Sequence, residues 1–241
     1  MTRIWYDRRL RKFVREVGSV VLGVLIALGL GEVATSIRWR FDAADAREAL
    51  AKDFLTDAGV MHERMLVGPC IDRRLREIDG VIRQARQSGA LPAVSTIGRP
   101  PTRPVVTAAW DMSVSSGVLA HLPANEAAGA SANYDMIKEL AGDMKRQSGL
   151  WARLSAIENA AGPISPELTS EMMLTTAELR KGSAYVHLVA EQIVTLARTM
   201  GPIRYWMILD RDGGTVGDVT AGLRGRGICA PLTVDGKRYT G

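Results

Sequence analysis

The sequence holds few of the residues on which metal-binding and nucleophilic chemistry depends. Its 241 residues include two cysteines and three histidines, and aromatic residues make up 5% of the chain. It contains no C-x-x-C, H-x-x-H or H-E-x-x-H spacing, and no G-x-S-x-G, S-x-x-K, Walker or Rossmann pattern. These absences exclude c-type haem attachment, zinc ribbons and thioredoxin chemistry. We therefore expect no catalytic residue, no metal site and no enzyme.

Excess positive charge is scarce outside the N-terminus. The formal net charge is +5 and the isoelectric point is about 9.5. Residues 1–16 hold six basic groups against Asp7 and Glu16, so this short segment carries most of the excess. The rest of the chain is close to neutral, and we therefore expect no nucleic-acid partner.

A long apolar run follows the basic start. Residues 17–30 read VGSVVLGVLIALGL without a charge, and the run extended to residue 37 predicts a membrane-spanning helix. Trp5 lies before this helix, and Trp39 and Phe41 lie after it, where aromatic side chains anchor a span at the membrane interface. A retained anchor is the preferred interpretation, and a cleaved signal peptide is the alternative.

The distribution of Lys and Arg predicts the orientation. Six basic residues precede the apolar run and four follow within a similar distance, which favours a cytoplasmic N-terminus. The sequence then predicts a cytoplasmic basic stub (1–16), a transmembrane helix (17–37), an extracytoplasmic α-helical domain (38–209) and a Gly-rich C-terminal arm (210–241). We expect a single-pass protein of a bacterial inner membrane with the bulk of the chain in the periplasm.

Small residues recur every four positions along the predicted span, at Ser19, Gly23, Ala27 and Gly31. Such a face lets two helices approach closely in lipid, although Gly and Ala are also common in membrane spans generally. With a single span, the helix that packs there belongs to another chain. Glu32 lies near the outer end of the span, where its carboxylate either snorkels to the interface or bonds to a partner subunit or pigment-like ligand.

Beyond the span, apolar residues recur at helical spacing and strand alternation is nearly absent. Helices are predicted at 38–66, 69–87, 105–122, 124–160 and 166–200, with a break at Gly68-Pro69, a loop at 88–104 and Ser165 as an N-cap. The sequence leaves three interpretations of residues 203–209: the end of the last helix, a short strand or a contact patch. The predicted fold class is all-α: one N-terminal transmembrane helix, an extracytoplasmic helical bundle-like domain and a Gly-rich C-terminal arm.

Residues 69–87 carry an arginine-rich face opposite their apolar stripe. Its members are Arg73, Arg74, Arg76, Arg83 and Arg86. We expect these side chains to be solvated, and contact with anionic headgroups or an acidic partner is the alternative. The two cysteines, Cys70 at the start of this segment and Cys229 in the arm, fall in a compartment where disulfides persist. We predict that they bond and pin the arm, with two unpaired thiols as the alternative.

Several short segments are similar to those of a known family: FVREV at 13–17, VLGVLIAL at 21–28, CIDRRL at 70–75, Trp110, and HLP at 121–123. Over most of residues 10–200 the chain resembles an uncharacterised bacterial family of N-terminally anchored single-pass membrane proteins with a helical extracytoplasmic domain. The resemblance implies the anchor and the helical fold. It implies no activity and no catalytic residues.

These features favour a non-catalytic accessory or stabilising subunit of a larger inner-membrane complex, docked through its transmembrane and periplasmic helices. Its partners are then other membrane-protein subunits and membrane lipids. By analogy, the host is an energy-transducing complex, either a photosynthetic reaction-centre–antenna or a respiratory one. We expect no cofactor of its own, with contact to lipid or pigment at the transmembrane helix. The alternatives are an anchored periplasmic sensing or small-ligand-binding module, or a homo-oligomer paired through Gly23 and Ala27. Polar groups converging around His121 or His187 would instead favour an enzyme.

Overall fold

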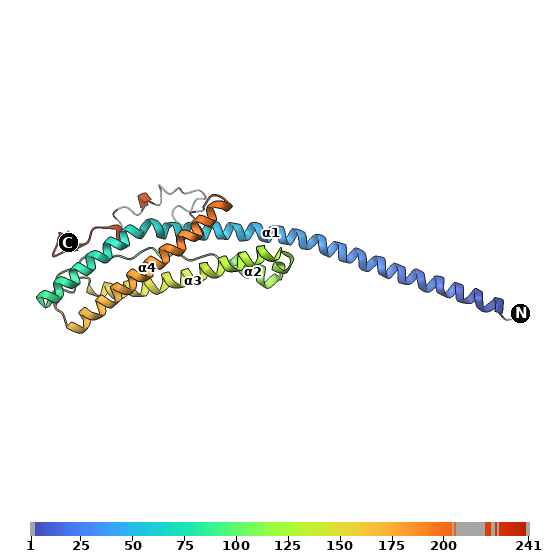
Figure 1. The fold of residues 1–241 in the computed structure, drawn as a ribbon, viewed down its shortest axis with the longest axis horizontal. Coiled ribbons are helices and arrows are strands. Elements are labelled where there is room, and N and C mark those ends of the chain that lie inside the picture. The colour runs from blue at the N-terminus through green and yellow to red at the C-terminus, as the bar shows by residue number, and fades with distance from the viewer. Residues whose placement is uncertain (1–2, 204, 206–219, 223–224, 226, 240–241) are drawn as a thin grey trace.

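One very long helix organises the molecule. The structure is a computed structural model that describes residues 3–203, 205, 220–222, 225 and 227–239. In the first helix, the side chains are described at residue 13 and from residue 15 onward. Helix α1 (Arg3–Ser88) is continuous. Its N-terminal half projects alone as a rod, and the other helices lie along its C-terminal half (Figure 1).

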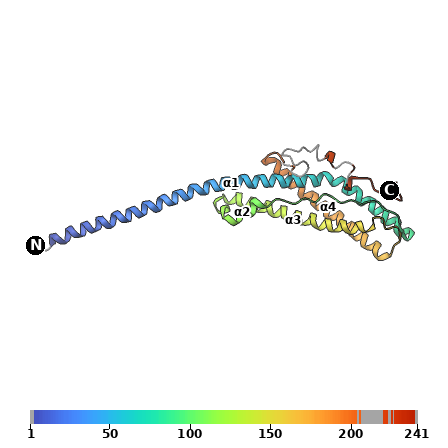
Figure 2. The ribbon, with the colours of Figure 1, turned by 180° about the vertical axis from the view of Figure 1, so that it is seen from behind.

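The helices that pack on α1 form a bundle with it. They are α2 (Ala108–Ser116), α3 (Ala124–Leu154) and α4 (Pro166–Met200), with short 3-10 turns η1 (Val118–His121), η2 (Ser155–Ile157) and η3 (Gly227–Cys229). In the views from both sides, α3 and α4 run beside the C-terminal half of α1 (Figure 2). Ser165 accepts a hydrogen bond from the Leu168 amide at 3.2 Å, so the predicted N-cap of α4 is confirmed.

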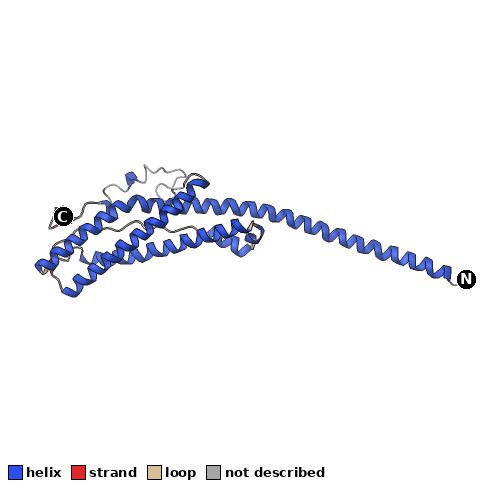
Figure 3. Cartoon of the chain, viewed as in Figure 1, coloured by secondary structure: helices blue, strands red, loops and turns tan. Residues whose placement is uncertain are grey.

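The strands in the described part of the chain are all two residues long. β1 (Ala90–Leu91) pairs antiparallel with β2 (Gly162–Pro163), and β3 (Thr233–Val234) forms a hairpin with β4 (Lys237–Arg238). Both pairs lie at the edges of the bundle and add nothing to its layers (Figure 3). The all-α class is therefore confirmed.

Two large apolar clusters hold the bundle together. The first joins Ile71, Leu75 and Ile78 of α1 to Trp151 of α3 and Leu179 of α4, all at most 2% exposed. The second lies nearer the projecting rod and has the same helices as its walls. Its buried members include Phe54, Met61, Ile137, Leu140, Ile193 and Val194. The apolar stripes of the three helices face one another, as their periodicity predicts.

The predicted break at Gly68-Pro69 is wrong, because α1 continues through Pro69 to Ser88. A proline inside a helix removes one backbone hydrogen bond and costs about 3 kcal/mol. The packing of α4 along this stretch offsets that cost, and a Cβ placed on Gly68 would lie 3.6 Å from His187 Nδ1. Figure 1 shows that α1 changes direction inside the bundle, and proline is a common cause of such bends.

Other predicted boundaries shift by a few residues. The helix predicted at 105–122 forms only as α2, which stops at Gly117 in a left-handed conformation (φ 75°), and the turn η1 follows. The helix predicted at 124–160 ends at Leu154. Most of residues 203–209 and the first part of the arm lie outside the described residues. The described segment 227–239, named here the C-terminal segment, lies against the bundle.

Gly98 provides a first test of how the C-terminal segment docks. Its φ is +71°, and an added Cβ would lie 2.7 Å from Gly227 C and 2.8 Å from the Ile228 amide nitrogen. We expect Gly98→Ala to lower the free energy of unfolding by about 2–4 kcal/mol, because both the left-handed backbone and the backbone contact oppose a side chain. Denaturant unfolding of the detergent-solubilised chain measures this change.

The matched control is Gly117→Ala, which has a similar φ of +75° with no atom within 4 Å of the added Cβ. It should lose only about 1 kcal/mol, because the conformational penalty acts without a clash. Equal losses in the two variants would contradict the proposed backbone contact at Gly98.

Candidate functional site

The apolar stretch of α1, residues 17–37, is exposed along its whole length. By length and composition α1 can cross a membrane, and none of its most apolar window is buried inside the molecule. Val20, Leu25 and Leu30 are 66%, 59% and 66% exposed. Soluble proteins rarely expose so large a continuous apolar surface, which marks a site of contact with lipid or protein.

The predicted small-residue face lies on this exposed rod. Gly23 and Gly31 have no atom within 4 Å of an added Cβ, so no described part of the chain covers them. Ser19 donates from its hydroxyl to the carbonyl oxygen of Glu16 at 2.8 Å, which satisfies it within the helix. Ala27 and Glu32 are exposed. Helix packing at this face therefore stays a prediction.

The predicted interface anchors fall in different surroundings. The Phe41 side chain is 68% exposed. Trp39 stacks on His121 with ring centroids 3.9 Å apart, and Arg38 lies 5.6 Å from the centroid of its ring. Trp39 therefore joins the rod to turn η1 of the bundle, a contact that the sequence did not reveal. The side chain of Trp5 lies outside the described part of the chain.

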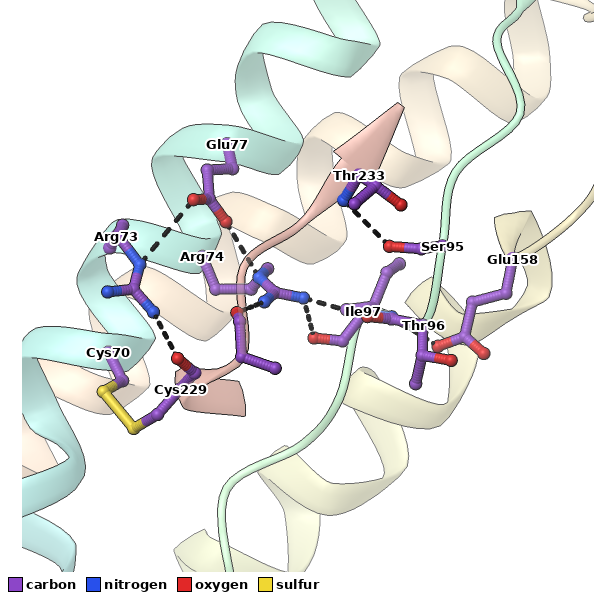
Figure 4. Close-up of polar contacts among 11 residues, drawn as sticks. Cys70, Arg73, Arg74, Glu77, Ser95, Thr96, Ile97, Glu158, Cys229 and Thr233 are labelled. Atoms are coloured by element: carbon purple, nitrogen blue, oxygen red, sulfur yellow. Dashed lines mark hydrogen bonds and ion pairs between the residues drawn. A yellow bond between two sulfur atoms is a disulfide. The ribbon is translucent and has the colours of Figure 1, made fainter. Parts of the chain in front are cut away.

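The predicted disulfide is confirmed. Cys70 of α1 and Cys229 of turn η3 have their sulfur atoms 2.10 Å apart and their Cα atoms 5.0 Å apart. The bond joins the C-terminal segment to the middle of the bundle across a separation of 159 residues (Figure 4).

Arg74 lies at the centre of the polar contacts around this disulfide, one turn further along α1. It is fully buried and donates to the carbonyl oxygens of Thr96 (3.1 Å), Ile97 and Ala230, and from Nε to Glu77 (2.9 Å) (Figure 4). Burial lowers the pKa of Arg74, and the Glu77 carboxylate opposes that shift. The expectation that Arg74 is solvated is wrong, because the loop after α1 and the C-terminal segment close over it.

Neighbouring contacts tie the same three segments together. Arg73 donates to the Cys229 carbonyl oxygen at 3.0 Å and lies 3.6 Å from a Glu77 oxygen. The Ser95 hydroxyl accepts from the Thr233 amide at 2.9 Å. The C-terminal segment is therefore held by a covalent bond and by several independent hydrogen bonds.

A second buried polar group holds the start of α2. The Asp57 side chain is 0% exposed; its Oδ1 accepts from the Val106 amide at 2.7 Å, and its Oδ2 has no partner among the described residues. Asp53, one turn earlier, accepts from the Ala109 amide at 2.9 Å. Burial raises the pKa of Asp57 to about 7; the Val106 amide opposes this rise, and the charge of Asp53 adds to it.

This raised pKa predicts a pH-dependent stability. Unfolded Asp57 ionises near its ordinary value of 3.8, whereas the folded chain keeps the proton until about pH 7. The folded state then binds more protons, so the free energy of unfolding falls as pH rises from about 4 to 7, by up to about 4 kcal/mol. Asp57→Asn keeps an acceptor for Val106 and cannot ionise. It should gain about 2–4 kcal/mol over the parent at pH 7.5 and little at pH 4.

Denaturant unfolding at several pH values measures this difference. Asp135→Asn, at an exposed position of α3, is the control and should follow the parent curve within about 0.5 kcal/mol. A parent and an Asp57→Asn variant with parallel pH profiles would contradict the prediction.

The histidines lie apart. His121 stacks on Trp39, and His187 of α4 lies next to Gly68. The His62 ring nitrogen Nδ1 is 2.5 Å from the Tyr205 hydroxyl, and burial together with Arg198 lowers the pKa of His62. Among the residues that the structure describes, no three His, Cys, Asp or Glu side chains lie close enough to hold a metal ion. No family model, no curated protein and no solved structure matches the chain.

Proposed function

We propose that the chain is a single-pass inner-membrane protein with its helical domain on the extracytoplasmic side, and that it acts as a non-catalytic accessory subunit of a larger membrane complex. The observation that carries this proposal is the fully exposed apolar stretch of α1. Burial in lipid removes that surface from water. The disulfide supports an oxidising compartment for the domain, which agrees with the excess of basic residues before the span.

The continuity of α1 gives this subunit a mechanical role. The helix runs without interruption from the apolar stretch into the bundle core and ends at Ser88. At about 1.5 Å rise per residue, the part from Ile37 to Ser88 is about 75 Å long along the helix. The continuous helix thereby connects the bundle directly to the span. The bundle can then stabilise the parts of neighbouring subunits that extend far from the membrane.

Two surfaces favour protein partners. The small-residue face of the span supports close helix packing in lipid. On the bundle, α4 turns large apolar side chains outward, with Leu174 72% and Leu188 55% exposed. Contacts at both surfaces, one in the membrane and one on the bundle, would fix the orientation of the chain against a host complex.

The decisive experiment extracts the chain from its native membrane and identifies the proteins that remain bound to it. We expect it to co-migrate with a large complex after mild-detergent extraction and size separation, with its companions identified by mass spectrometry. Gly23→Leu with Ala27→Leu should abolish co-migration, because the added side chains keep a partner helix away. Gly18→Leu with Gly29→Leu is the matched control, about 150° around the helix at 3.6 residues per turn.

All four positions lie on the exposed rod, and the glycines among them have no atom within 4 Å of an added Cβ. Neither pair of substitutions therefore alters packing within the chain. Migration of the unmodified chain as a lone monomer would overturn the proposal. Equal effects of the two pairs would show that the small-residue face is not the docking surface.

A ligand-binding module is the second candidate function. A groove of about 340 Å³ between α1 and α4 favours it. The groove has polar and apolar walls and lies beside the buried guanidinium of Arg64. Binding of a small molecule by the isolated chain would support this second role whether or not a host complex exists.

A further inference from the structure

Arg64 is a buried cation without a carboxylate partner at ion-pair distance in the described chain. Its side chain lies on α1, and the residue is 6% exposed. One terminal nitrogen donates to the Gln147 side-chain oxygen at 2.5 Å, whereas Nη1 has no partner among the described residues. Burial lowers the pKa of Arg64 to about 10, and the nearby charge of Asp72 opposes that shift, so the group stays charged at neutral pH. A charge in this position is costly unless an anion compensates it.

Arg74 shows by comparison how a buried arginine of the same helix is satisfied. Both arginines are buried side chains of α1, but Arg74 meets three carbonyl oxygens and a carboxylate. The Gln147 amide nitrogen, on the side chain that accepts from Arg64, also lacks an acceptor among the described residues. Native structures rarely leave neighbouring buried donors without an acceptor.

The groove beside Arg64 has the size and lining of a small-molecule site. Its volume of about 340 Å³ lies at the lower end of ligand pockets, which range from about 300 to 1,000 Å³. Pro69, Ile71 and Val186 supply apolar wall, and Ser183 and His187 supply polar groups from α4. Gly68, without a side chain, lies in the same wall.

We infer that this groove binds a small organic monoanion, a carboxylate with a short hydrocarbon body, through the Arg64 guanidinium. The carboxylate oxygens supply the acceptors that Arg64 lacks, and Arg is suited to bidentate pairing with a planar carboxylate. The hydrocarbon body lies against the apolar wall. Asp72, exposed at the same groove, already offsets part of the Arg64 charge, so the groove favours a monoanion over a dianion. This inference is independent of the proposed accessory role.

Butyrate is the probe, tested on the full-length chain in detergent. We expect millimolar butyrate to raise the melting temperature in a saturable way, by about 3 °C at ten times its dissociation constant. Butanamide, which has the same body without the charge, and sodium chloride at equal ionic strength should give no shift. Inorganic phosphate, largely a dianion above pH 7, should bind at least tenfold more weakly than butyrate.

Two variants locate the site. Arg64→Met should abolish the butyrate shift. Ala184→Phe, at an exposed position of the groove wall, should abolish it without disturbing the core, so the test survives if Arg64→Met fails to fold. Ala177→Phe, also exposed on α4 and away from the groove, is the matched control and should keep the full shift.

The inference is overturned by any of three results: no shift with butyrate, an equal shift with butanamide or chloride, or an undiminished shift in Ala184→Phe. Tighter binding of phosphate than of butyrate would overturn the assignment of a monoanion. Because the measurement uses the isolated chain, its failure leaves the co-migration test of the accessory role unaffected.

Discussion

Replacing Arg74 by methionine should be among the most destabilising single substitutions in the chain, with a loss of about 3–5 kcal/mol in the free energy of unfolding. The guanidinium is fully buried and serves four acceptors, one of them the Glu77 carboxylate. Methionine fills much of the volume but donates no hydrogen bond. Glu77 then loses its closest cationic partner, and the carbonyl oxygens of Thr96, Ile97 and Ala230 lose the donor that joins them.

Two substitutions separate this effect from a general loss of charge. Arg76→Met removes an arginine from the same helix at an exposed position and should change stability by no more than about 0.5 kcal/mol. Arg74→Lys keeps the charge but presents a single nitrogen, so its loss should be intermediate. Denaturant unfolding gives the energies, and limited proteolysis reports whether residues 227–239 detach. Equal stability of the two methionine variants would contradict the central role of Arg74.

The sequence predicts most of the helical architecture because each helix carries its own signal. Apolar residues at helical spacing mark the core faces, and the Ser165-Pro166 pair marks the start of α4. The cysteine pair was also predictable, since the predicted extracytoplasmic placement favours disulfides and two cysteines leave one possible intramolecular bond. Local patterns and composition carry this information without any knowledge of distant contacts.

The features that the sequence did not reveal depend on distant segments. Pro69 locally favours a break, yet α1 continues through it in the bundle, where α4 packs along α1. Arg74 lies on the same side of α1 as Ile71 and Ile78, about 200° from Arg76, and a loop and the C-terminal segment close over it. The tertiary fold also removes the charged side chains of Asp57 and Arg64 from water. Helical spacing indicates which side of α1 a charged residue faces, but not which distant segments supply its hydrogen-bond partners.

Loss of the Cys70–Cys229 bond is the second substitution of large expected effect. The bond closes a loop with a separation of 159 residues, and chain entropy gives an upper value of about 5 kcal/mol for such a loop. Cys229→Ser, Cys70→Ser and the double variant should lose similar amounts, because each removes the same cross-link. A reductant should destabilise the parent chain by a similar amount and leave the serine variants unchanged.

The bond and Arg74 should also be energetically coupled, because Ala230 follows Cys229 directly and accepts a hydrogen bond from Arg74. If the C-terminal segment detaches in Cys229→Ser, Arg74 has already lost this contact, and Arg74→Met costs less in that background. We expect a coupling energy of about 1–2 kcal/mol in the double-mutant cycle measured by denaturant unfolding. Strict additivity would mean that the segment keeps its place without the disulfide, and that its hydrogen bonds alone are sufficient to dock it.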